Sequence, residues 1–105
     1  GHRREVKPVP QYPAVRRDIA FVAGADIRHA DVESVIRKAA PAELTGIELF
    51  DMFSSKEIGK GKRSLGYALE FRSAERTLTD SEVNAAFIKI AEALKEGLGV
   101  ELREE

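Results

Sequence analysis

The sequence has no cysteine, and its 105 residues include only two histidines, His2 and His29. The absence of cysteine excludes disulfide bonds, thiolate metal sites and cysteine nucleophiles, and it agrees with a reducing, cytoplasmic environment. His29 has neither a second histidine nor a carboxylate cluster at metal-ligand spacing, so we interpret it as a surface or helix-cap residue. A metal chaperone that holds its ion through paired cysteines is therefore excluded.

The chain also lacks a strong net charge and a long apolar run. Seventeen basic residues nearly balance 18 acidic ones, so any surface for nucleic acid must be a local patch. The apolar stretches are only a few residues long, and we expect neither a membrane-spanning nor an export segment. The length fits one domain with one hydrophobic core.

Three of the four prolines lie within residues 1–13. Because proline fixes its own backbone and biases the preceding residue towards extended conformations, this polar stretch is typical of a linker or docking arm. We therefore divide the chain into a tag remnant and proline-containing linker at 1–13, with the tag remnant at Gly1-His2, and one domain at 14–105. A chain that opens in this way resembles one domain excised from a longer protein; the alternative is a mobile arm on a free-standing protein.

Four segments are predicted to be β-strands: in chain order, the first, third and fourth alternate apolar residues with polar or small ones, and the second is an apolar segment too short for a helix and rich in strand formers. In the third segment one face is bulky, whereas the other carries only the small residues Ser64, Gly66 and Ala68 before Glu70. The predicted strands are 15–22, 47–53, 64–71 and 100–103.

Two segments have the apolar spacing of amphipathic helices. The first spans 30–40 and ends at Pro41. The second begins at Thr79, because the Thr-Asp-Ser-Glu sequence there is a capping box: the Thr79 hydroxyl accepts from the Glu82 backbone N–H, and the glutamate accepts from the Thr79 N–H. Glycines near residue 98 end this helix.

The predicted order β-α-β-β-α-β is that of the α+β, ferredoxin-like sandwich, in which two helices cover one face of a four-stranded antiparallel sheet. The other face stays uncovered, and RNA-recognition domains stack bases on such a face. Many unrelated activities share this architecture, so the fold alone assigns no function.

Four motifs add a more specific signal: YPAVRRDIAF at 12–21, LFDMF at 49–53, GKRSLGY at 61–67 and RTLTD at 76–80. In this order they resemble the P-x-x-x-R-D-[IL]-[AS]-F, L-F-D-x-Y, G-K-K-S-L-A-[FY] and R-T-L-T-D motifs of one family. That family is the C-terminal, ferredoxin-like anticodon-binding domain of the bacterial phenylalanyl-tRNA synthetase β subunit. Phe53 departs from the pattern, because the family commonly has tyrosine there; phenylalanine keeps the π-face and loses the hydroxyl.

The resemblance implies a partner and an enzyme for the chain. The partner is the anticodon stem-loop of phenylalanine tRNA, bound during aminoacylation by phenylalanine-tRNA ligase. The other implied partners are the synthetase α subunit and the rest of the β subunit, in a heterotetramer with two copies of each subunit. No cofactor and no catalytic residue is implied in this domain, whereas ATP and Mg²⁺ are implied for the full enzyme.

By position, the resemblance implies that Asp51 and Phe53 meet the first anticodon base, a guanine. Guanine offers two neighbouring donors, N1–H and the exocyclic amino group, and a carboxylate accepts both at once. Phe53 lies two residues further on, hence on the same strand face, where its ring can stack on the base. Without the resemblance, we would interpret Asp51 as a turn residue and Phe53 as a core aromatic.

Several cations are further candidates for RNA binding. Four of them crowd the connection before the third strand against one acid, Glu57, a local charge of +3 that can neutralise phosphates or simply keep a loop solvated. They are Lys56, Lys60, Lys62 and Arg63.

The first and third predicted strands supply the remaining candidates. Arg16 and Arg17 open the first strand, where they either face RNA or form an internal ion pair with Asp18. Ser64 and Gly66 lie on the small face of the third strand, which permits close approach of a base, or of a packed loop.

Two other function classes share the predicted fold. A regulatory small-molecule-binding or protein-interaction domain would bind an amino acid at a helix–strand or subunit interface. An enzyme of the acylphosphatase kind needs an asparagine and a glycine-rich phosphate cradle after the first strand, and residues 22–26 supply neither. Because no Ser-His-Asp set or isolated carboxylate pair appears either, we expect no catalysis by this chain.

Overall fold

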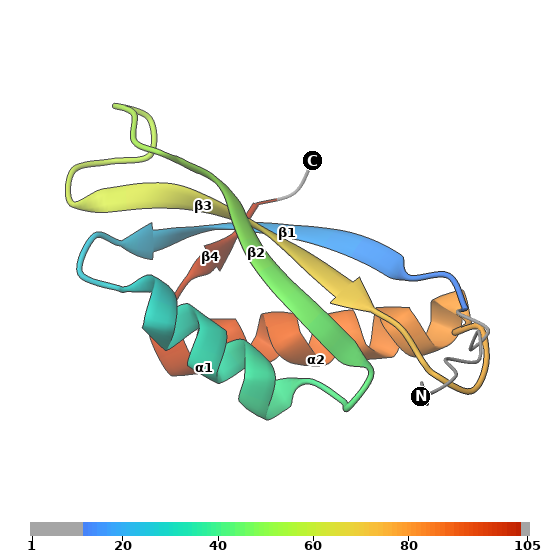
Figure 1. The fold of residues 1–105 in the computed structure, drawn as a ribbon. Helices are drawn as coiled ribbons and strands as arrows, with labels where there is room; N and C mark the ends of the chain where they lie inside the picture. Colours follow the sequence, from blue (N-terminus) through green and yellow to red (C-terminus); the bar gives the residue numbers. More distant parts are fainter. Residues whose placement is uncertain (1–11, 104–105) are drawn as a thin grey trace, which may run out of the picture.

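The structure, a computed structural model, describes residues 12–103 and contains every predicted helix and strand (Figure 1). The predicted linker at 1–13 lies outside the described residues except for its last two positions. The elements are β1 (Val15–Gly24), α1 (His29–Ala39), β2 (Leu44–Phe53), β3 (Lys62–Phe71), α2 (Asp80–Leu98) and β4 (Glu101–Leu102).

The four strands form one antiparallel sheet in the order β2-β3-β1-β4. The short strand β4 extends the sheet at β1, where Leu102 pairs with Phe21 and the Arg103 N–H donates to the Ala20 carbonyl at 2.8 Å. Both helices lie on the same side of the sheet (Figure 1). The predicted ferredoxin-like arrangement is therefore confirmed.

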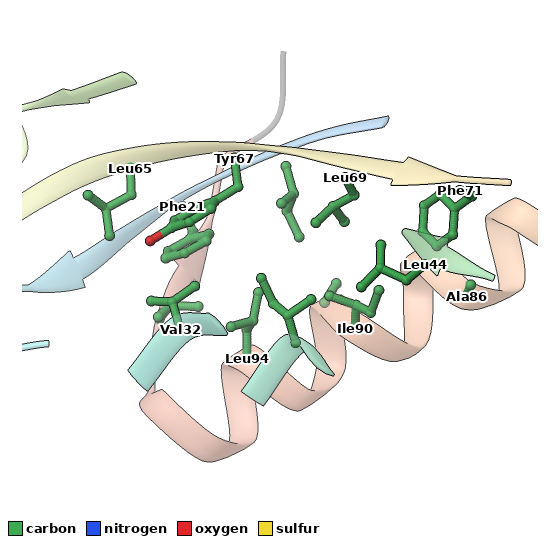
Figure 2. Close-up of a cluster of buried hydrophobic side chains, with 14 of the residues drawn as sticks. Phe21, Val32, Leu44, Leu65, Tyr67, Leu69, Phe71, Ala86, Ile90 and Leu94 are labelled. Atoms are coloured by element: carbon green, nitrogen blue, oxygen red, sulfur yellow. The ribbon is translucent and has the colours of Figure 1, made fainter. Parts of the chain in front are cut away.

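The core lies between the sheet and the two helices (Figure 2). The bulky face of β3 points into it, as the alternation predicts, and each of its four large side chains is at most 3% exposed. Burying such a side chain stabilises the fold by about 1.5–3 kcal/mol. This fixes which side of β3 faces the helices. The four residues are Leu65, Tyr67, Leu69 and Phe71.

Helix α2 begins at the predicted capping box. The Thr79 hydroxyl accepts from the Glu82 N–H at 3.2 Å, and Glu82 Oε1 accepts from the Thr79 N–H at 2.9 Å. Arg76 donates to the same carboxylate at 2.7 Å, and these bonds from Arg76 and the Thr79 backbone lower the pKa of Glu82 to about 2. Gly99, at a φ of 65°, ends the helix. Neither helix of the described part combines the length and the apolarity needed to cross a membrane.

Candidate nucleic-acid interface

Strand β2 carries a bulge where the predicted site residues lie. Leu49 pairs with Tyr67, and Asp51 pairs with Gly66. Phe50 is the extra residue between these two pairs. Because Tyr67 points into the core, its neighbour Gly66 faces the side of the sheet opposite the helices, which we call the open face. A Cβ atom on Gly66 would lie 3.2 Å from Phe50 Cζ and 3.3 Å from Asp51 Cβ, so both side chains lie on the open face.

Phe53 joins them on this face, since it pairs with Ser64, two residues before Gly66. The Phe50 and Phe53 rings are 49% and 41% exposed. Asp51 is also exposed, and no hydrogen bond or ion pair joins it to another residue of the described chain. The open face therefore presents an uncommitted carboxylate between two exposed aromatic rings.

Small side chains of β3 form the floor beneath these groups. Ser64 and Ala68 are 3% and 7% exposed, and Gly66 lies between them. A hollow of about 350 Å³ opens above the Ser64 and Gly66 part of this floor, with Phe50, Asp51 and Phe53 along its β2 side. The predicted small face of β3 is thus the base of a concave site.

Arg103 closes the hollow from the β4 side. Its Nη1 donates to Ser64 Oγ at 2.9 Å, and its guanidinium carbon lies 5.5 Å from the centroid of the Phe53 ring. The motifs do not single out this residue, although the alternation at 100–103 contains the signal. Because Leu102 packs against the core, Arg103 must face the open side.

Arg16 lies on the same face, beside Phe50 but outside the lining of this hollow. Its guanidinium carbon is 5.4 Å from the centroid of the Phe50 ring, and its Nε donates to Asp18 Oδ1 at 2.8 Å. The hydrogen bond and charge of Asp18 raise the pKa of Arg16. The internal ion pair that the sequence leaves open is therefore present, and it holds Arg16 beside Phe50.

Two of the predicted RNA-binding arginines point away from the hollow. Arg17 is on the helix side of β1, where its Nη2 donates to Asn84 Oδ1 of α2 at 2.6 Å. Arg63 is half-buried, and its Nη2 donates to the Ile27 carbonyl at 2.8 Å. The structure does not bring either arginine together with Asp51.

The three predicted lysines remain available to solvent. Lys56 and Lys60 lie in the β2–β3 connection, which projects beyond the sheet in Figure 1, and Lys62 begins β3. All three are exposed and have no ion pair with another described residue. The positive patch that borders the open face therefore consists of these three lysines rather than of four cations.

The helix side of the sheet offers a different kind of hollow, of about 470 Å³, between the end of α1 and the first half of α2. Its aromatic residue, Phe71, is only 1% exposed, and one of its two carboxylates, Glu82, is committed to Arg76 and Thr79. Within residues 12–103, no three histidine, aspartate or glutamate side chains are grouped to hold a metal ion. The open face thus remains the better candidate site.

Comparison with known sequences bears directly on this site. Residues 10–103 match the family described as the ferredoxin-fold anticodon binding domain. The chain belongs to this family. The matched region of this anticodon-binding domain contains all of the open-face residues described above and the whole helix layer.

The domain is also similar to curated relatives that are each named as a phenylalanine–tRNA ligase β subunit. It is 43% identical to that of Symbiobacterium thermophilum and 44% identical to that of Trichormus variabilis, in each case over 92% of this chain. The identity to that of Moorella thermoacetica is 45%, over 93% of the chain. The aligned region is only 11% to 12% of the length of these relatives.

Proposed function

We propose that this domain is the anticodon-recognition part of a phenylalanine–tRNA ligase β subunit, and that its open face binds the anticodon stem-loop of phenylalanine tRNA. The observation that carries the proposal is the uncommitted Asp51 carboxylate between two exposed rings. Family membership and the named relatives support it.

Asp51 would supply the base discrimination. Its two carboxylate oxygens accept from N1–H and the exocyclic amino group of guanine, a pair of donors that adenine and the pyrimidines do not present. A carboxylate that already had an internal partner would have to lose it before binding. Asp51 has none within the described chain, so it is free to meet the base.

Phe53 and Arg103 would hold the base in place. A base stacks on an aromatic ring largely irrespective of its identity, because every base has a π-face. Arg103 bonds to Ser64 on the floor and lies over the Phe53 ring, so before RNA binds it fixes the position of that ring at the edge of the hollow. Stacking and discrimination would thus come from different side chains.

Lys56, Lys60 and Lys62 would neutralise RNA phosphates beside the hollow. Such contacts position the RNA and release counterions, but they do not read bases. Aminoacylation, with its ATP and Mg²⁺, would be carried out by parts of a cytoplasmic ligase outside this chain, together with the α subunit.

The test is a titration of the isotope-labelled chain, followed by NMR, with two hairpin RNAs that carry the anticodon loop. They differ only in the first anticodon base, guanine or adenine. The wild-type chain should prefer guanine, and Asp51→Asn should reduce this preference on the order of tenfold, because its amide presents donors to the donors of guanine.

Glu92→Gln is the matched control, since it removes an exposed carboxylate from α2 on the helix side. It should leave the preference unchanged. An unchanged preference in Asp51→Asn, with a folded spectrum, would show that the carboxylate does not read the base. If neither RNA shifts any resonance while free amino acids do, the regulatory small-molecule function replaces this one.

A further inference from the structure

We infer that Phe50 and Arg16 form a second base-stacking platform on the open face, for a nucleotide adjacent to the one read at Asp51. The inference rests on the proposed function and extends it from one base to two successive bases. It begins from Phe50, a residue that guanine recognition by Asp51 and Phe53 does not require.

Phe50 keeps almost half of its surface exposed on β2, which is an edge strand of the sheet. The bulge brings Asp51 opposite Gly66, and so onto the face that Phe50 occupies. Bulges frequently aim side chains next to binding sites. Two exposed rings on one face of a four-stranded sheet match the way RNA-recognition domains stack two or three bases.

The pair formed by Phe50 and Arg16 resembles the pair formed by Phe53 and Arg103. The two distances from guanidinium carbon to ring centroid are 5.4 and 5.5 Å. A guanidinium plane is itself a stacking surface for an RNA base, and the bond to Asp18 holds that of Arg16 in position. Each pair can therefore offer a flat surface to one base.

The hollows of the open face agree with two separate positions. Phe50 lines the central hollow, whereas Arg16 lines a neighbouring one of about 230 Å³ with Gly46 and Ala68. The carboxylates of Glu48 and Glu70 border this second hollow and repel a phosphate. The group that enters it is then a base, with the RNA backbone kept outside.

The experiment measures Kd by NMR titration with four hairpin RNAs. One is intact, and the others are abasic at the first anticodon position or at one of its two neighbours. Phe50→Ala should weaken binding to the intact hairpin at least about 5-fold, the low end expected for loss of one stacked base. Phe50→Ala should not weaken binding to one of the two RNAs that are abasic at a neighbouring position. It should still weaken binding to the RNA that is abasic at the first anticodon position.

Phe53→Ala should weaken binding to the intact hairpin and to both RNAs that are abasic at a neighbouring position. It should not weaken binding to the RNA that is abasic at the first anticodon position. Ile88→Ala is the control for removal of an exposed apolar side chain, because Ile88 is 56% exposed on α2, and it should bind as wild type does. Phe50→Leu keeps an apolar group over Gly66 without an aromatic face. It should bind as weakly as Phe50→Ala if stacking is the cause.

The outcomes separate this inference from the proposed function. If the effect of Phe50→Ala disappears on the first-position abasic RNA, Phe50 belongs to the first base site and the second platform does not exist. Wild-type binding by Phe50→Ala or Phe50→Leu would also overturn the inference. If the wild-type chain does not bind the intact hairpin, or Asp51→Asn and Phe53→Ala have no effect, the proposed function itself fails.

Discussion

Gly66 allows the fold and the RNA site to be tested separately, because its missing side chain matters to the open face and not to the core. A Cβ atom here would lie 3.2 Å from Phe50 Cζ and 3.3 Å from Asp51 Cβ, tighter than ordinary van der Waals contact. Gly66 has no positive φ, so alanine does not strain the backbone. We therefore expect Gly66→Ala to move the ring and the carboxylate by a few tenths of an ångström.

Two opposing contributions set the change in unfolding free energy. Alanine in a strand is favoured over glycine by about 0.5–1 kcal/mol. Overpacking costs about 1–3 kcal/mol in a tight core, but Phe50 is half-exposed and can yield into solvent. The net change should stay below about 1 kcal/mol, whereas RNA affinity should fall several-fold because the floor of the hollow rises.

Urea unfolding and the hairpin titration together check this prediction. Gly97→Ala is the control, since its Cβ would meet Val35 Cγ2 at an ordinary 3.6 Å within the helix layer; it should leave RNA affinity unchanged. A loss of more than about 2 kcal/mol in Gly66→Ala would show that Phe50 is rigidly held. Wild-type affinity in a stably folded Gly66→Ala would refute the role of the floor.

Three further measurements address the charged residues. Replacing Lys56, Lys60 and Lys62 together by alanine should flatten the salt dependence of RNA affinity by about two units of log–log slope, with little effect on base preference. Glu82→Gln should reduce acid sensitivity: the carboxylate stabilises the fold above its unfolded pKa of 4.5, and the wild type loses this stabilisation as the pH falls to about 2. Acid unfolding followed by circular dichroism checks this, and an identical pH dependence in both proteins would contradict it. Arg103→Gln should weaken binding of guanine and adenine hairpins equally, whereas a selective loss for guanine would assign base reading to Arg103.

The fold is predictable from the sequence where local and tertiary signals agree. The bulky face of β3 is also its buried face, and the capping box at Thr79 forms the bonds that its sequence predicts. Both features depend on neighbours within a few positions. The buried face of a strand is predicted from which alternate residues are apolar, and the helix cap is predicted from the residues of the first turn.

The site is less predictable, because the bulge reverses the alternation of β2. Leu49 faces the helices, so strict alternation would send Asp51 and Phe53 to the same side and Phe50 to the other. The bulge depends on pairing with β3, and no local pattern in β2 records it. Only the family resemblance placed Asp51 and Phe53 at an RNA site, and nothing in the motif pointed to Phe50.

The arginines show a second limit, since a count of charges does not say which face they occupy. Arg17 lies two residues before the core residue Ile19, and Arg63 lies two residues before the core residue Leu65, so each arginine points to the same side of the sheet as that core residue. Both turn to the helix side, where they bond to Asn84 and to the Ile27 carbonyl. The alternation of each strand can be read from the sequence. It distinguishes Arg17 and Arg63 from Arg103 better than the clustering of charged residues does.

The exposed groups of the open face must be stable in the free domain, and binding of RNA must still lower the free energy. Phe53 leaves part of its ring in water, and Arg103 covers it with a cation–π contact, worth about 0.5–1 kcal/mol at exposed sites. A stacked base is worth about 1–3 kcal/mol, so it can replace this contact with a net gain. The bond from Arg103 to Ser64 does not depend on the ring. Arg103 can therefore stay anchored to the floor while its place over Phe53 passes to the base.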